Sequence, residues 1–168
     1  MEMKIKKADE KELDAAIALS EKYCYKNSSP DSKGYILKPI TREFLNSLYV
    51  AKIGDKVVGA VCAPDFSEED FKIYGVGKDS RRKQFVKVTV DKDYRGKQVA
   101  SNLIRFVMNK YPDVRFYASI MEDPVENVAS KRLFNSLGFK CYKTMASHYN
   151  DLNLSETSGF YVCEKNKK

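Results

Sequence analysis

The hydrophobic pattern of this chain changes its period near the middle of the sequence. Val86, Val88 and Val90 alternate with other residues, which is the two-residue period of a strand. From Val99 to Met108, apolar residues recur at helical spacing until Pro112 ends the pattern. A strand that leads through a short turn into a helix, with another strand beyond it, predicts a crossover unit in which helices cover a sheet.

Further strands and helices are expected on both sides of this unit. Strands are predicted near residues 3–6, 48–53, 57–63, 114–121, 140–146 and 159–164, and helices from residue 9 to about 24, after Thr41, from Gly96 and from Asp123. Gly54-Asp55 indicates a hairpin turn. The order β-α-α-β-β-β-α-β-α-β-β favours an α/β (α+β) fold, with a single mixed, mainly antiparallel sheet of about six or seven strands flanked by helices on both faces.

Several helix starts carry recognisable caps. Asp9 and Glu12 form a capping box, and Thr41 is expected to cap the second, short helix. Asp123 is expected to cap the last helix, with Pro124 at its first position. Residues 26–38 are rich in turn residues, and residues 64–83 form a long polar connection.

Length and charge narrow the class of protein. The 168 residues, of which 43% are hydrophobic, predict a single domain over residues 1–168. The formal net charge of +7 favours anionic partners such as a phosphorylated cofactor. Basic and aromatic residues do not interleave into a continuous stripe, so nucleic acid is not the expected partner. The sequence leaves the oligomeric state open, and a homodimer is one of the assemblies it allows.

The cysteines and the apolar segments point to a cytoplasmic protein. Cys24, Cys62, Cys141 and Cys163 are far apart and form no Cys-x-x-Cys pair, so neither a metal site nor a disulfide framework is expected. They are predicted to be free thiols in a reducing compartment. No stretch approaches the ~20 apolar residues that cross a bilayer, and no signal-peptide pattern opens the sequence. We therefore expect no membrane partner.

The turn after the valine strand has the chemistry of an anion site. Arg95, Gly96 and Lys97 are expected to open the following helix, where the first N–H groups have no partners and the helix dipole is positive. A pyrophosphate can accept several of these hydrogen bonds at once. Gly96 lets the backbone approach the ligand, while Arg95 and Lys97 add positive charge.

Together with a second segment, this turn resembles the GNAT superfamily of N-acetyltransferases. The family's first motif, V-x-x-x-Y-R-G-x-G-x-G/A, is matched by Val90, Tyr94, Arg95, Gly96 and Ala100. Its second motif, N-x-x-A-x-x-L-Y-x-x-L-G-F, is matched in register by Asn127, Leu133, Leu137, Gly138 and Phe139. The two motifs lie within residues 84–139, and the order of elements agrees with the family over nearly the whole chain.

The resemblance implies an acetyl-CoA site and assigns residues to it. The pyrophosphate would be held by Arg95, Gly96, Lys97, Gln98, Val99, Ala100 and Ser101. The backbone of Val88 and Val90 would pair with the pantetheine arm, and the Val88 N–H would face the thioester oxygen. Asn127 would hydrogen-bond the arm from its other side, and Phe134 would also line the cofactor site.

Three departures from the family pattern bear on binding or catalysis. Gln98 replaces a glycine, so this position must either keep a negative φ or adopt the left-handed conformation at a cost. Phe134 replaces a tyrosine that is thought to protonate the departing thiolate, and Gln84 lies roughly where some members carry a glutamate base. Because general acid catalysis is typically worth ~10²- to 10⁴-fold, slowed or water-assisted turnover is expected rather than none.

The implied reaction is direct attack of an amine on the thioester in a ternary complex. The amine must lose a proton, and Glu122 is the preferred acceptor over Asp123, Tyr149 and the single histidine, His148. An acyl-cysteine intermediate on Cys62 is not expected, since no histidine is placed to activate it.

The acceptor is not readable from the sequence, and a second function class stays open. Residues 26–38, residues 64–83 and the final hairpin are expected to select the acceptor, a small molecule or a peptide. The departures at Phe134 and Gln84 equally suit an acetyl-CoA-binding sensor or interaction domain with weak catalysis.

Overall fold

The computed structural model describes residues 2–24 and 36–163 and contains a seven-stranded sheet flanked by helices. The strands lie in the order β1-β2-β3-β4-β5-β7-β6, and the described pairings are antiparallel, which confirms the predicted fold class. The elements are β1 (Met3–Lys7), α1 (Glu10–Lys22), η1 (Arg42–Ser47), β2 (Leu48–Ile53), β3 (Lys56–Cys62), α2 (Glu68–Tyr74), β4 (Arg82–Val90), η2 (Lys92–Tyr94), α3 (Val99–Lys110), β5 (Arg115–Asp123), α4 (Val128–Ser136), β6 (Phe139–Tyr149), η3 (Asn150–Leu152) and β7 (Leu154–Cys163).

By its internal contacts the chain divides into two compact units. The first unit comprises Met1–Pro64 and Phe85–Tyr111, and the second comprises Asp65–Gln84 and Pro112–Lys168. The first unit therefore contains the valine strand and the turn that follows it. The second contains Asn127, Phe134 and Glu122.

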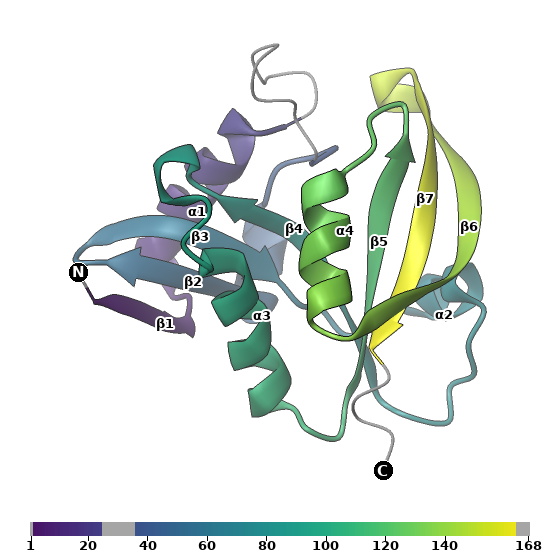
Figure 1. Ribbon diagram of the computed structural model, residues 1–168, viewed down its shortest axis with the longest axis horizontal. Helices are drawn as coiled ribbons and strands as arrows, with labels where there is room; N and C mark the ends of the chain where they lie inside the picture. Colours follow the sequence, from purple (N-terminus) through teal and green to yellow (C-terminus); the bar gives the residue numbers. More distant parts are fainter. Residues whose placement is uncertain (1, 25–35, 164–168) are drawn as a thin grey trace. The chain divides into compact units, whose positions relative to one another are not determined.

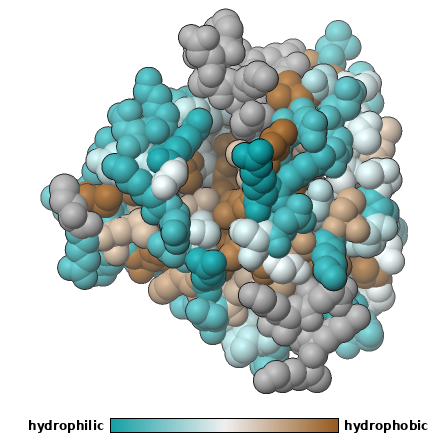
Figure 2. Space-filling view, viewed as in Figure 1, coloured by the Kyte–Doolittle hydropathy of each residue, from teal (hydrophilic) through white to brown (hydrophobic). Residues whose placement is uncertain are grey.

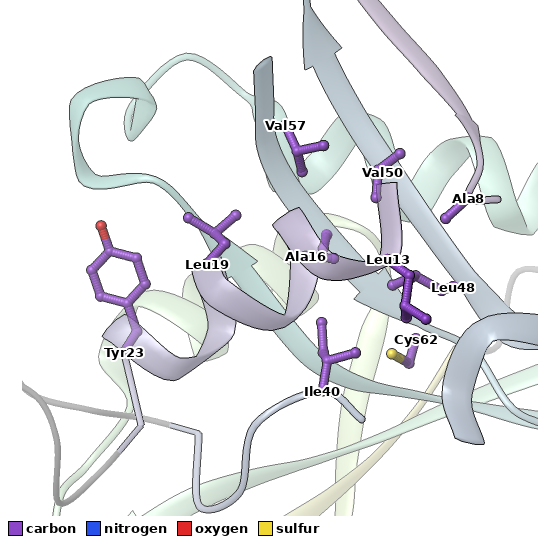
Figure 3. Close-up of a cluster of buried hydrophobic side chains, with 11 residues drawn as sticks. Ala8, Leu13, Ala16, Leu19, Tyr23, Ile40, Leu48, Val50, Val57 and Cys62 are labelled. Atoms are coloured by element: carbon purple, nitrogen blue, oxygen red, sulfur yellow. The ribbon is translucent and has the colours of Figure 1, made fainter. Parts of the chain in front are cut away.

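The core of the first unit lies between α1 and the strands β2 and β3 (Figure 3). Asp9 caps α1 with the predicted capping box, and the helix ends at Lys22. Its apolar face packs on alternate residues of the strands, because side chains on a strand point to opposite faces in turn. The buried cluster consists of Ala8, Leu13, Ala16, Leu19, Tyr23, Ile40, Leu48, Val50, Val57, Ala60 and Cys62.

Two helices cover opposite faces of the sheet in this unit (Figure 1). Ala60 belongs to the cluster beneath α1, whereas a Cβ built on the preceding residue, Gly59, would meet α3. That Cβ would lie 2.6 Å from Val99 Cγ1, 3.2 Å from Leu103 Cδ1 and 3.5 Å from the Thr89 carbonyl oxygen. The missing side chain of Gly59 therefore allows the start of α3 to lie directly on β3.

The second unit is also covered on both faces of its three strands. Phe160 of β7 stacks on Tyr74 of α2, with ring centroids 4.8 Å apart. The preceding residue, Gly159, leaves room on the other face for Glu122, which forms an ion pair with Lys131 of α4. Phe66, Tyr74, Tyr117, Phe160 and Val162 form the buried cluster under α2.

Several predictions about individual elements were wrong. The connection from 64 to 83 contains the helix α2, which a capping box of Ser67 and Asp70 begins and Gly75 ends with φ 67°. Residues 42–47 form a 3-10 helix, and the Thr41 side chain makes no cap hydrogen bond. Asp123 is the last residue of β5, so it does not cap the last helix. Most of the segment 26–38 lies outside the described residues.

Hydrophilic residues are spread over the face shown in Figure 2, with hydrophobic residues between them. Within residues 2–24 and 36–163, every helix is too short or too polar to span a bilayer.

Candidate functional site

A bulge interrupts β4 where the sequence pattern predicts a regular strand. Val86 pairs with Cys62 and Thr89 with Ala60, so Lys87 and Val88 together face the single residue Val61 on β3. Lys87 has a φ of 56°, a left-handed conformation that is unusual for a residue with a side chain. An extra residue of this kind re-aims the backbone and the side chains next to it. The predicted contact residue Val88 lies in this bulge.

The turn after β4 is held by Asp91. Its Oδ1 atom accepts a hydrogen bond of 3.0 Å from the Asp93 N–H, and its Oδ2 atom lies 3.5 Å from Lys56 Nζ. Burial acts to raise the pKa of Asp91, but the hydrogen bond from Asp93 and the charge of Lys56 outweigh it and lower the pKa. Asp91 therefore stays charged and fixes the start of the short helix η2.

A continuous run of backbone donors follows this turn. Among the described residues, the N–H groups from Gly96 to Ser101 donate to no protein acceptor, and the first bond of α3 runs from the Asn102 N–H to the Gln98 carbonyl at 3.0 Å. Residues 95–98 are exposed. Nothing lies within 4 Å of the position that a Cβ on Gly96 would occupy. The geometry suits an anion that accepts several N–H bonds at once.

The helix begins later than the sequence pattern indicates. Its first residue is Val99 rather than Gly96, and Gln98 is the N-cap, with φ 61°, ψ 23° and no side-chain cap bond. Of the two conformations open to Gln98, the structure has the left-handed one. Because Gly96 also has a positive φ of 76°, the backbone alternates in sign along the loop, as it does in anion-binding nests.

Tyr23 connects the basic loop to the end of α1. Its hydroxyl accepts a hydrogen bond of 2.9 Å from the Lys92 N–H, and its ring lies 4.5 Å from the Arg95 guanidinium carbon. Arg95 Nε also donates to the Val90 carbonyl at 3.2 Å. Lys97 lies over the Tyr94 ring at 5.3 Å. Arg95 thus links the end of β4 at Val90 to the ring of Tyr23, and Lys97 lies beside Tyr94 in the same turn.

Asn127 caps α4, a role that the sequence interpretation gave to Asp123. Its Oδ1 atom accepts a 3.0 Å hydrogen bond from the Ser130 N–H, and its own N–H donates to the Met121 carbonyl at 2.9 Å. The side chain is buried. One amide oxygen is therefore used within the protein, which leaves the Nδ2 donors for another partner.

Phe134 and Gln84, which also depart from the family pattern, contact only apolar or uncharged groups in the interactions described below. Phe134 is 3% exposed and packs edge-on against Phe139, with ring centroids 5.0 Å apart. Gln84 Oε1 accepts a 3.1 Å hydrogen bond from the Tyr74 hydroxyl. Burial raises the pKa of Tyr74, so this hydroxyl stays protonated and keeps donating. Neither Phe134 nor Gln84 supplies an ionisable group.

The preferred proton acceptor, Glu122, is already in an ion pair. It lies at a bulge in β5, because Met121 pairs with Ser158 and Asp123 with Thr157. Lys131 Nζ contacts Glu122 Oε2 and lies 3.0 Å from Glu126 Oε1. These hydrogen bonds raise the pKa of Lys131, so the ammonium is fully charged near neutral pH.

The alternative proton acceptors differ in their surroundings. Tyr149 donates a 2.7 Å hydrogen bond to the buried Glu156, and burial together with this bond raises the pKa of Tyr149, which disfavours its basic form. His148 is exposed, with Nδ1 2.9 Å from Ser155 Oγ. Burial raises the pKa of Cys62 to about 12, so it is a thiol and a poor nucleophile at neutral pH.

Sequence reasoning missed two residues near the loop. Gly59 makes the close contact between β3 and α3 possible, and an isolated glycine inside a valine-rich strand was the available signal. Lys87 was placed on a regular strand, whereas it occupies the bulge. A lysine between Val86 and Val88 was the only signal, and the bulge itself depends on pairing with β3.

Solved structures with the same fold include several acetyltransferases. An N-acetyltransferase from Staphylococcus aureus Mu50 has a TM-score of 0.69 at 18% identity, over 96% of this chain and 98% of its own. The ribosomal-protein-alanine N-acetyltransferase from Brucella melitensis has a TM-score of 0.70 at 18% identity, over 94% and 97%. Arabidopsis thaliana Naa50, in complex with the bisubstrate analogue CoA-Ac-MVNAL, has a TM-score of 0.68 at 15% identity, over 95% and 97%.

These identities are low enough that the structures show the fold alone. No curated protein matches the chain. A family model does match, over residues 14–139 of this chain. This range runs from within α1 to the start of β6, so it includes both motifs and the run of N–H donors. The chain therefore belongs to the acetyltransferase (GNAT) family.

Proposed function

We propose that this protein is an N-acetyltransferase that transfers an acetyl group from acetyl-CoA directly to an amine. The observation that carries the proposal is the run of N–H donors from Gly96 to Ser101, whose first part is exposed, with the positive charges of Arg95 and Lys97 beside it. Such a loop fits a pyrophosphate, which carries two negative charges and several oxygen acceptors. Membership of the acetyltransferase family supports the same cofactor.

Some of these residues are proposed to bind acetyl-CoA, and others to activate the thioester or the amine. The loop holds the pyrophosphate, Asn127 Nδ2 donates to the pantetheine arm, and the Val88 N–H polarises the thioester carbonyl. The neutral amine attacks that carbonyl, the C–S bond breaks, and CoA leaves as a thiolate. A thiol with a pKa of about 8.5 is a fair leaving group, so Phe134 slows the reaction without preventing it. Glu122 is proposed to accept the amine's proton, directly or through water.

Two matched glycine variants test the cofactor site. Gly96 and Gly54 both have a positive φ, of 76° and 59°, and in both cases nothing lies within 4 Å of an added Cβ. Gly96→Glu and Gly54→Glu therefore introduce similar backbone strain and the same charge. Only the first places a carboxylate against the pyrophosphate, and a charge repulsion of a few kcal/mol predicts about 100-fold weaker acetyl-CoA binding.

Isothermal titration calorimetry with acetyl-CoA measures this difference, and thermal unfolding checks that both variants fold. The Gly54→Glu protein should bind within about threefold of the wild type, because Gly54 lies in the turn between β2 and β3, outside the run of N–H donors, and salt screens its exposed charge. Equal affinities for the two variants would refute the assignment of the loop.

Turnover is tested by thiol release from acetyl-CoA over a panel of amines. The panel should contain small amines, amino acids and peptides with a free N-terminal alanine or methionine. Mass spectrometry of the product identifies the acylated nitrogen. Release of CoA with formation of an N-acetyl product supports direct transfer.

An acetyl-CoA-binding sensor is the second candidate function. It is favoured by the hydrophobic burial of Phe134 and by Gln84, since neither can donate or accept a catalytic proton. The same assays separate the two functions. Tight acetyl-CoA binding, without thiol release on any amine, would support the sensor and contradict the transferase.

A further inference from the structure

Lys87 combines backbone strain with an ammonium that forms no ion pair within residues 2–24 and 36–163. It is one of three residues other than glycine with a positive φ in the described part of the chain, and the only one of them inside a strand. Its side chain is half-buried. A residue held in a strained conformation needs support from its surroundings, and such residues concentrate at functional sites.

The contacts of the Lys87 ammonium are few. Nζ donates a 2.8 Å hydrogen bond to the Lys38 carbonyl and lies 5.3 Å from the centre of the Phe44 ring. Within residues 2–24 and 36–163, no carboxylate forms an ion pair with it, and the negative charge of Glu43 acts on it only from beyond ion-pair distance. The neighbouring groups Cys24 and Cys62 are neutral thiols, because burial raises the pKa of both.

This arrangement is costly unless a ligand completes it. An ammonium has three N–H donors, and the Lys38 carbonyl takes one of them. Partial burial of a charge without an ion-pair partner is unfavourable, and burial lowers the pKa of Lys87 despite the opposing charge of Glu43. An anionic group would accept the remaining hydrogen bonds and neutralise the charge.

The position of Lys87 connects it with the acceptor rather than with the pyrophosphate. Its backbone immediately precedes Val88, whose N–H is proposed to face the thioester. Its side chain reaches Lys38, the last residue of the segment predicted to select the acceptor. The bulge thus places a cation between the proposed reaction point and Lys38.

We propose that Lys87 binds a carboxylate of the acyl acceptor, so that the preferred substrate is an amine that also carries a carboxylate, such as an amino acid. This inference rests on the proposed acetyltransferase function. It makes Lys87 a specificity-determining residue: the ammonium holds the acceptor carboxylate while the acceptor nitrogen reaches the thioester.

The test compares acceptor pairs in which each amine is offered as its free acid and as its carboxamide. Wild type, Lys87→Met, Lys87→Arg and the exposed control Lys11→Met are assayed with each pair. Lys87→Met keeps the aliphatic stem but removes the charge. It should lower kcat/KM for the acids by about 10- to 100-fold, mainly through KM, as expected for loss of a charge-assisted hydrogen bond. It should change the carboxamides by less than about threefold.

The acid-to-amide ratio is compared between variants, so differences in amine basicity within a pair cancel. Lys87→Arg retains a cation and should keep a clear preference for the acids. Lys11→Met should behave as wild type, because Lys11 is exposed on α1. Thermal unfolding and acetyl-CoA titration establish that each variant folds and binds the cofactor.

The outcomes separate the inference from the function on which it rests. An equal loss for acids and carboxamides in Lys87→Met would assign Lys87 to proton transfer or to positioning and overturn the carboxylate proposal. Unchanged kcat/KM for both acids and carboxamides in that variant would overturn it as well, with the transferase proposal intact. Absence of turnover by the wild type on every acceptor would overturn both.

Discussion

Replacing Gly59 with alanine tests whether α3 must lie as close to β3 as the structure places it. The new Cβ would be 2.6 Å from Val99 Cγ1, whereas carbon atoms in contact are normally about 3.5–4.0 Å apart. Val99 would have to move by about 1 Å, and a β-branched side chain in a helix has little freedom to do so by rotation. Such overpacking costs about 1–3 kcal/mol, which the lower flexibility of alanine offsets by about 0.5–1 kcal/mol.

The double variant Gly59→Ala/Val99→Ala isolates this contact. Val99→Ala alone removes two buried methyl groups and should cost about 1.5–2.5 kcal/mol. In the double variant the added methyl group occupies part of the vacated space, so its total cost should be about 1–2 kcal/mol below the sum of the single costs. Urea unfolding of the four proteins measures these free energies, provided that the slope with denaturant is unchanged.

The same four proteins connect packing with the cofactor site. Val99 is the first residue of α3 and contributes one of the free N–H donors, so its displacement should weaken acetyl-CoA binding about tenfold in Gly59→Ala, and the double variant should recover most of the loss. Additive free energies, within about 0.5 kcal/mol, would refute the claim that Gly59 and Val99 compete for the same space.

Two further substitutions probe strain and burial in the same unit. The buried Thr89 Oγ1 has no hydrogen-bond partner among the described residues, so Thr89→Val should raise the free energy of unfolding by about 1 kcal/mol, and equal or lower stability by thermal unfolding would contradict this. Gln98 has a φ of 61°, which a β-branched residue adopts only with strain. The variant Gln98→Val should therefore lower the free energy of unfolding by about 1–2 kcal/mol, whereas Gln98→Gly should not lower it. Equal stability of Gln98→Val and wild type in urea would be inconsistent with the left-handed cap.

Local patterns in the sequence predicted the elements that are capped or periodic. Asp9 and Glu12 form the expected capping box, and Gly54 turns the expected hairpin. The helix α2 was missed because it is short and lies in a polar connection, although Ser67 and Asp70 carry a capping signal. Asp123-Pro124 matched a helix start as well as Asn127 did, and only the structure shows that β5 continues through Asp123.

The loop and the bulge show where local patterns stop being sufficient. The basic residues and Gly96 were identified from sequence because an anion site needs charge and close backbone approach. The sequence did not predict the conformation of Gln98, because the same residues are compatible with a helical and with a left-handed backbone at this position. The bulge at Lys87 arises from pairing with β3, so a period-two pattern on β4 alone could not predict it.

The Tyr23 side chain contributes both to the packing of α1 and to the position of the basic loop. Its hydroxyl and ring hold the loop through Lys92 and Arg95, while its position in the buried cluster makes it part of the packing of α1. A substitution that repacks α1 therefore also alters the loop that is proposed to bind acetyl-CoA. Because Tyr23 and Arg95 are in contact, the effects of substitutions at the two positions should not add, so the tolerance of one position to mutation should depend on the residue at the other.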